Sequence, residues 1–194
     1  MDIHLIRHGK TLANEKQLFY GRTDLPLAEN GKAELLVLKS QGIYPSPIEL
    51  FFTSGLLRTE QTVDILYGSV SRTVVPDLAE YDFGRFEMKD YQELKEREDY
   101  QQWITDKTGT VPCPGGESKT QFRKRVIDGY SRIEDEILQT GAYSALVSCH
   151  GGTIACIMEF LQPNTDNYYG WLPQTGRGYT LIYASGRLHQ YRPI

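Results

Sequence analysis

The amino-acid sequence predicts an α/β fold that forms one domain over residues 1–194. Short apolar runs typical of buried strands alternate with segments of helical character, and this alternation favours a sheet covered by helices. A chain of 194 residues with 40% hydrophobic and 24% charged side chains can bury one sizeable core. Polar residues follow three of the strand-like runs, and they indicate where a functional site would form.

The first half of the chain contains three predicted strands and three predicted helices. The apolar run over residues 2–7 stops at His8-Gly9, as expected of a buried strand. Ser54 precedes the second helix and is a candidate N-cap. The expected strands cover residues 2–7, 48–53 and 73–75, and the expected helices cover residues 28–40, 56–66 and 90–103.

The second half contains the strongest helical pattern in the chain, over residues 117–139. A loop over 108–116, rich in proline and glycine, precedes it. Apolar side chains recur in this helix at spacings of three and four, which places them on one face: Phe122, Val126, Tyr130, Ile133 and Ile137. The remaining expected elements are a strand over 144–148, a helix over 152–160, and a hairpin of strands 178–184 and 188–191 joined at Ser185-Gly186.

Charge and cysteine content narrow the class of protein. The formal net charge of -4 argues against broad nucleic-acid binding, which usually requires a basic excess. No run approaches the roughly 20 apolar residues of a membrane span, and MDIHLIRHGK lacks the pattern of a secretory signal. The three cysteines form no Cys-x-x-Cys pair, which predicts reduced thiols in the cytoplasm and no zinc site.

The polar residues after the strands form one predicted cluster. The first strand ends at Arg7-His8-Gly9, the second leads through Ser54 to Arg58, and the strand over 144–148 leads to His150. Ligands of open α/β sheets bind at the carboxyl ends of the strands. Two histidines and two arginines should therefore meet at one edge of the sheet.

Such a cluster suits phosphate chemistry. Arginine presents a planar fork of donors that matches phosphate oxygens, and glycines such as Gly9 and Gly151 allow a ligand to approach the backbone. Helices that begin just after these loops would direct N–H groups at an anion. Histidine can attack phosphorus and carry the phosphoryl group covalently. The leaving oxygen also needs a proton, so an acid should stand opposite the nucleophile.

Six blocks of sequence together resemble the histidine phosphatase superfamily, which includes cofactor-dependent phosphoglycerate mutases and α-ribazole phosphatases. The blocks are LIRHGKTLAN (5–14), YGRTDLPLAENG (20–31), TSGLLRTEQT (53–62), LAEYDFGRFE (78–87), PGGES (114–118) and VSCHGGTI (147–154). They fall in the family's order and cover nearly the whole chain. The resemblance implies a three-layer α/β/α sandwich like that of phosphoglycerate mutase.

The resemblance also implies roles for individual residues. His8 would be the nucleophile that becomes phosphohistidine, and Glu80 would be the proton donor, carrying a proton at the moment of transfer. The implied substrate-binding residues are Arg7, Asn14, Tyr20, Gly21, Arg58, His150 and Gly151. No metal and no organic cofactor is implied.

Two positions depart from the family's pattern. Lys10 stands where glutamate or glutamine is common, which adds positive charge near the pocket. Met88 replaces a usual glycine and would alter the loop that carries Glu80, so Glu87 is kept as the alternative acid.

The expected function is two-step hydrolysis of a small phosphomonoester. PGGES and the compact length look most like the α-ribazole phosphatase and broad-specificity branches. One alternative is a phosphotransferase of the phosphoglycerate mutase type, although the chain is short for that group. Another is a catalytically inactive module that binds a phosphate ligand. The expected partner is a small-molecule phosphate ester, without nucleic acid or membrane, and the oligomeric state is left open.

Overall fold

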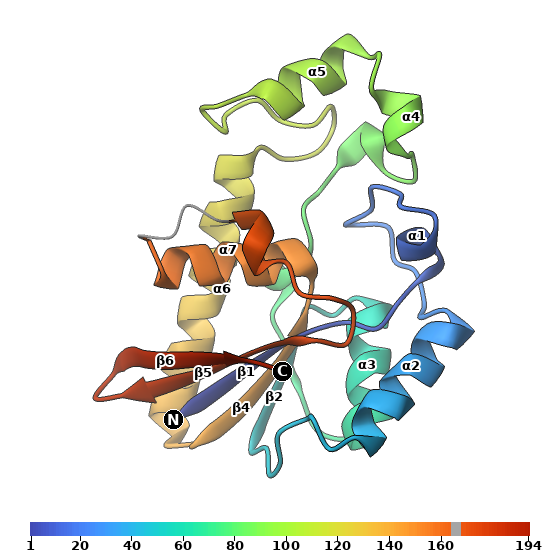
Figure 1. The fold of residues 1–194 in the computed structure, drawn as a ribbon. Coiled ribbons are helices and arrows are strands. Elements are labelled where there is room, and N and C mark those ends of the chain that lie inside the picture. The colour runs from blue at the N-terminus through green and yellow to red at the C-terminus, as the bar shows by residue number, and fades with distance from the viewer. Residues whose placement is uncertain (164–167) are drawn as a thin grey trace.

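The computed structural model describes residues 1–163 and 168–194 and is built on a six-stranded mixed sheet (Figure 1). The strands are β1 (Asp2–Arg7), β2 (Leu50–Thr53), β3 (Thr73–Val74), β4 (Ser144–Cys149), β5 (Gly178–Ala184) and β6 (Arg187–Pro193). Their order is β3-β2-β4-β1-β5-β6. The first four strands run parallel, whereas β5 is antiparallel to β1 and β6 is antiparallel to β5.

Helices cover both faces of this sheet, which confirms the expected α/β/α arrangement (Figure 1). The α-helices are α1 (Leu12–Glu15), α2 (Glu29–Ser40), α3 (Leu57–Tyr67), α4 (Tyr91–Leu94), α5 (Glu98–Thr105), α6 (Lys119–Thr140) and α7 (Gly151–Leu161). The short 3-10 helices are η1 (Pro76–Leu78), η2 (Gly84–Phe86) and η3 (Tyr168–Trp171). No helix among the described residues is long and apolar enough to cross a membrane.

Alternation along the central strands divides the core into two parts. Successive side chains of a strand point to opposite faces of its sheet. Leu5 therefore packs in the core under α6 and α7, whereas Ile6 packs in the core under α2 and α3. Phe52 and Phe51 divide in the same way. Burial on both faces explains why these strands read as continuous apolar runs.

Helix α6 confirms the strongest helical prediction. Its five predicted core residues are all buried. Ser118 begins the helix with a capping box that pairs its side chain with Gln121, and Gly141 ends it in a left-handed conformation at φ 71°. The helix therefore begins two residues after the expected start.

The expected helix over 90–103 is wrong, because the chain forms α4 and α5 with a break between them. Leu94 and Trp103 both pack into the core under α6 and α7. In a continuous helix, nine residues at about 100° each would place these two side chains on opposite faces. The break, where Arg97 has an extended backbone, lets both side chains reach the same core. In Figure 1 these helices stand apart from the sheet, at the top of the view.

Candidate active site

His8 lies directly after β1 and is buried, with 3% of its surface exposed. Its Nδ1 lies 2.7 Å from the Gly9 carbonyl oxygen. A carbonyl can only accept a hydrogen bond, so Nδ1 carries the proton and Nε2 keeps its lone pair. Burial lowers the pKa of His8 well below its ordinary value, and the charges of Arg58 and Arg7 lower it further. The imidazole is therefore neutral, and its Nε2 carries a free lone pair.

Arg58, on the first turn of α3, is completely buried. Its guanidinium donates to the carbonyls of Gly21 at 2.7 Å and Thr23 at 3.0 Å, and its Nε donates to His150 at 3.3 Å. It also lies over the ring of Tyr20, 4.8 Å from the centroid. Arginine has five N–H donors, so two remain for a ligand.

Arg7 contributes a second guanidinium at the same end of the sheet. One of its terminal nitrogens donates to the carbonyl of Pro173 at 2.8 Å, whereas its Nε is buried without a hydrogen-bond partner among the described residues. A buried donor without a partner is costly, and an anion would relieve that cost. A Cβ at Gly151 would stand 3.2 Å from the Arg7 Cζ, so the guanidinium lies against the first turn of α7. That turn presents helix N–H groups to the same region.

His150 lies beside His8, with ring centroids 5.2 Å apart. Its Nδ1 accepts the Arg58 Nε–H, so its Nε2 donates to Ser54 Oγ at 2.8 Å. Burial, and then the charge of Arg58, lower the pKa of His150 well below its ordinary value. Ser54 is therefore not the predicted cap: α3 begins at Leu57, its N-cap is Leu56 without a side-chain hydrogen bond, and Ser54 orients His150 instead.

Asn14, Tyr20 and Gly21 join this cluster through a polar network. Asn14 Oδ1 accepts from the Tyr20 hydroxyl at 2.9 Å and from the Thr11 backbone at 3.0 Å, which leaves its amide nitrogen for a ligand. Gly21 supplies a carbonyl to Arg58, and a Cβ there would stand 1.7 Å from the Tyr81 carbonyl oxygen. Only glycine allows these two backbones to approach so closely.

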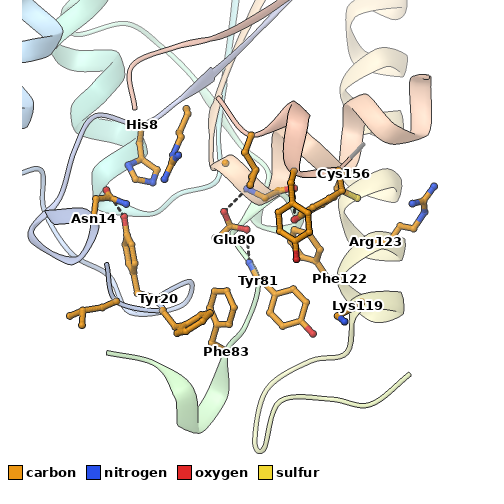
Figure 2. A pocket seen from close by; sticks show the side chains of 18 of the residues that line it. His8, Asn14, Tyr20, Glu80, Tyr81, Phe83, Lys119, Phe122, Arg123 and Cys156 are labelled. Atoms are coloured by element: carbon orange, nitrogen blue, oxygen red, sulfur yellow. Dashed lines mark hydrogen bonds between the residues drawn. The ribbon is translucent and has the colours of Figure 1, made fainter. Parts of the chain in front are cut away.

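Glu80 faces this group from the segment after η1 (Figure 2). One carboxylate oxygen accepts from the Gly152 backbone at 2.8 Å, and the other accepts from the Tyr81 backbone at 2.9 Å. A Cβ at Gly152 would lie 2.4 Å from Glu80 Oε1. The first turn of α7 therefore fixes both Arg7, beside Gly151, and Glu80, beside Gly152.

Comparison with known proteins identifies the family to which the chain belongs. The model of the histidine phosphatase superfamily (branch 1) matches residues 3–186. The chain is 28% identical over 165 residues to the adenosylcobalamin/alpha-ribazole phosphatase of Salmonella typhimurium, covering 83% of this chain and 79% of the relative. It is 29% identical over 164 residues to the probable phosphoglycerate mutase GpmB of Yersinia pestis, covering 83% and 74%.

The chain belongs to the histidine phosphatase superfamily. It is therefore a phosphatase, an enzyme that acts on phosphate esters. The crystal structure of the alpha-ribazole phosphatase from Shigella flexneri has the same fold, with a TM-score of 0.84 at 23% identity over 97% of this chain and 95% of that one.

Two positions that depart from the superfamily's pattern leave the site intact. Glu87, the alternative acid, accepts hydrogen bonds from the backbones of Gly21, Arg22 and Thr23 and does not line the active-site cavity. Met88 adopts φ 61°, the left-handed conformation that glycine takes readily. Lys10 pairs with Glu34 at 2.6 Å and does not itself line the cavity.

The phosphatase cavity has a volume of about 730 Å³ and extends well beyond the phosphate end. Sequence reasoning placed the wall in residues 81–115, which supply Tyr81, Phe83 and Trp103, but it singled out none of the aromatic residues of this wall: Phe19, Tyr81, Phe83, Trp103, Phe122, Tyr168 and Tyr169. Sequence also gave no sign of Arg125 on α6, which donates to the carbonyls of Asp77, Ala79 and Glu80. This arginine ties the segment that carries Glu80 to the longest helix. No group of three or more His, Cys, Asp or Glu side chains that could hold a metal ion occurs among the described residues.

Proposed function

We propose that this phosphatase hydrolyses a phosphomonoester in two steps through His8. The observation that carries the proposal is the 2.7 Å hydrogen bond from His8 Nδ1 to the Gly9 carbonyl. It leaves Nε2 with a free lone pair, beside two arginines. In the first step Nε2 bonds to phosphorus while the ester P–O bond breaks, and Glu80 gives a proton to the leaving oxygen. In the second step water bonds to phosphorus, the N–P bond breaks, and Glu80 takes the proton from water.

The phosphate oxygens would be neutralised by groups that already converge on His8. Phosphoryl transfer depends mainly on positioning and charge stabilisation. The two unused Arg58 donors, the unpartnered Arg7 Nε and the amide nitrogen of Asn14 support this role. The Gly151 N–H at the start of α7 is a further donor. Tyr20, Gly21 and His150 would act through these groups by holding Arg58 and Asn14.

The first substrate to test is α-ribazole 5'-phosphate, because relatives that match most of the chain carry that activity in their names. Other relatives are named phosphoglycerate mutases, so phosphoryl return to a sugar acid is the competing reaction. Lys119 and Arg123, the other cations that line the cavity among the described residues, are already bonded to protein groups. Arg123 is neutralised by Glu159, whereas Lys119 keeps its charge and one N–H donor, so Lys119 is the cation that a sugar-acid carboxylate would have to reach.

The test is phosphate release from a panel that contains α-ribazole 5'-phosphate, phosphoglycerates, sugar phosphates, nucleotides and p-nitrophenyl phosphate. Wild type and His8→Ala are compared, with exposed His189→Ala as the matched control. We expect turnover to vanish in His8→Ala alone. We also expect a phosphoprotein, trapped by rapid quench, that is stable in alkali and labile in acid.

Turnover that survives in His8→Ala would overturn the assignment of the nucleophile. Stimulated interconversion of phosphoglycerates by 2,3-bisphosphoglycerate would replace hydrolysis with mutase activity. Tight phosphoester binding without any turnover would indicate an inactive binding module.

We also propose that the enzyme is cytoplasmic and acts on a small molecule without nucleic acid or membrane. The three cysteines are buried and unpaired, which supports a reducing compartment. Cell fractionation with a phosphatase assay tests the location, and recovery of the activity in a secreted or membrane fraction would contradict it.

A further inference from the structure

We propose that a second cavity, beside α2, binds a small organic acid and that this acid weakens the binding of phosphate esters at the active site. The cavity has a volume of about 760 Å³, within the range of roughly 300–1,000 Å³ for small-molecule sites. Its walls come from α2, from residues at the end of β1 and just after it, and from the segment 174–177 that precedes β5. We call it the α2 cavity.

The charged side chains of the α2 cavity are mostly cationic. Arg7, Lys10 and Arg177 line it, with Glu34 as the one carboxylate. Glu34 pairs with Lys10 at 2.6 Å, which leaves Lys10 two of its three N–H donors. The Arg177 guanidinium makes no hydrogen bond or ion pair with another of the described residues. This excess of positive charge, in a chain whose formal net charge is -4, favours an anionic ligand.

The segment before β5 forms a fixed polar wall. The side chains of Gln174 and Thr175 have no hydrogen-bond partner within the described part of the chain, so they can donate to the same anion. Gly176 has φ 72°, its carbonyl accepts from the Tyr44 hydroxyl at 2.8 Å, and a Cβ there would stand 3.0 Å from the Leu38 side chain. Glycine therefore lets this segment pack directly on α2. A wall that is already in place loses little conformational entropy when a ligand binds.

The wall supplied by α2 is largely apolar. Ala33 and Val37 lie one helical turn apart, and Leu38 adjoins them. Val37 is 56% exposed, so the apolar part of a ligand would gain free energy by covering it. With Arg177 on one wall and hydrocarbon on the other, the cavity fits an acid that carries a short apolar body.

The α2 cavity is connected to the active site through Arg7, which lines both cavities. The Gly176 N–H donates to the carbonyls of Arg7 at 3.0 Å and His8 at 3.3 Å, and the Arg7 guanidinium donates to the Pro173 carbonyl at 2.8 Å. Two anions, one in each cavity, would share this arginine and repel each other. An acid in the α2 cavity should therefore weaken the binding of a phosphate ester, and the ester should weaken the binding of the acid by the same factor.

The binding test uses 4-methylpentanoate as the probe. Its uncharged amide lacks the anionic head, and acetate lacks the apolar body. Calorimetry measures the affinity, and shifts of the backbone amide resonances of α2 and 174–177 locate the site. We expect the acid to bind about tenfold more tightly than either comparison compound, because each lacks one of the two contacts.

Two variants separate the two walls. Arg177→Gln should weaken binding of the acid about tenfold, with Arg187→Gln, an exposed arginine that lines neither cavity, as the control. Val37→Ser should weaken binding of the acid about fivefold and leave acetate unchanged. Its control is Leu36→Ser, which changes a similarly exposed residue of α2 that does not line the α2 cavity.

The kinetic test measures KM for p-nitrophenyl phosphate as the concentration of 4-methylpentanoate rises. We expect KM of the wild type to increase about twofold or more and then to reach a plateau, because both ligands can bind together. An acid that occupied the active site itself would raise KM without limit. Arg177→Gln should keep the basal kcat and KM and lose the response at the same concentration of acid.

Equal binding of the acid and its amide, or unchanged binding of the acid in Arg177→Gln, would overturn the site. A KM that does not respond to the acid, or that rises without a plateau, would overturn its effect on the active site and with it the proposal. None of these results bears on the role of His8, because His8→Ala is assayed without the acid.

Discussion

The protonation state of His8 follows from its surroundings. Burial, reinforced by the charges of Arg58 and Arg7, lowers its pKa well below the ordinary value of about 6.5. A lowered pKa keeps the ring neutral at pH values where an ordinary histidine is protonated. We expect the ring ¹⁵N resonances of His8 in the free enzyme to remain those of the neutral Nδ1–H tautomer down to about pH 5.5. His8→Ala assigns the signals, and a titration midpoint near 6.5 would contradict the structure.

The proposed acid at Glu80 can be separated from binding by the choice of leaving group. The alkoxide of an alkyl phosphate needs a proton as it departs, whereas p-nitrophenolate leaves without one. Glu80→Gln should therefore lower kcat for an alkyl phosphate by about 10²–10⁴-fold and for p-nitrophenyl phosphate by much less. Glu159→Gln, a second cavity carboxylate, is the control. Equal losses for both substrates in Glu80→Gln would assign Glu80 to binding alone.

Sequence predicted the residues of the phosphate end because they follow strand ends in recognisable blocks. Arg7, His8, Arg58 and His150 meet as expected. Arg125 also pairs with Glu117, but its contact with the Glu80 segment could not be predicted, because those partners are backbone carbonyls at separations of 45, 46 and 48 residues along the chain. A hydrogen bond to a distant backbone leaves no local pattern in the sequence.

At the level of elements, α6 holds the loop of Glu80 through Arg125. The guanidinium donates to Asp77 O at 2.8 Å, Ala79 O at 2.7 Å and Glu80 O at 2.9 Å. Lysine lacks the planar fork that reaches three carbonyls at once. Arg125→Lys should lower kcat about tenfold for an alkyl phosphate and less for p-nitrophenyl phosphate, because the displaced group is the proposed proton donor. The control is Arg132→Lys, which changes an exposed arginine on the same helix. Equal losses of kcat for the two substrates in Arg125→Lys would indicate a purely structural role for Arg125.

The turn at Met88 offers a test of backbone strain. Its φ of 61° lies in the left-handed region, which costs an L-residue roughly 1–2 kcal/mol. Met88→Gly removes this cost and adds unfolded-state entropy of about 0.5–1 kcal/mol, so a net gain of up to about 1.5 kcal/mol is expected in urea unfolding. Ser185→Gly, at φ 51°, should respond in the same direction. A destabilised Met88→Gly would show that the Met88 side chain matters more than its conformation.

A helix can be predicted from the sequence when the residues that set its bounds lie within or next to it. Helix α6 carries its periodicity, its N-cap and its terminal glycine within its own sequence, so it could be predicted. The break between α4 and α5 is set by Leu94 and Trp103 reaching one core, which no window of sequence reveals. Helix α1 has only four residues and depends on the Thr11–Asn14 capping box, so its apolar pattern is too short to detect.

At the scale of the whole molecule, the two cores share one sheet, and we expect them to unfold together as one domain. Three buried histidines, His4, His8 and His150, then link this transition to pH. Each has a pKa lowered mainly by burial, to about 4 for His4 and well below the ordinary value for the other two. The unfolded chain binds protons below about pH 6.5 that the folded protein does not bind.

The free energy of unfolding should therefore fall as the pH decreases from about 6.5, with a limiting slope near 1.4 kcal/mol per pH unit for each histidine. The loss for His4 ends near its folded pKa of about 4. Urea unfolding at about pH 7.5 and about pH 5.5, followed by circular dichroism and fluorescence, measures the difference. Coincident transitions would support one domain, and separate transitions would contradict it.

The variant His4→Gln should reduce the difference in unfolding free energy between the two pH values by the contribution of one histidine. The control is His189→Gln, which changes an exposed histidine. Equal stability at the two pH values would mean that these histidines become protonated without unfolding the protein, which their burial argues against.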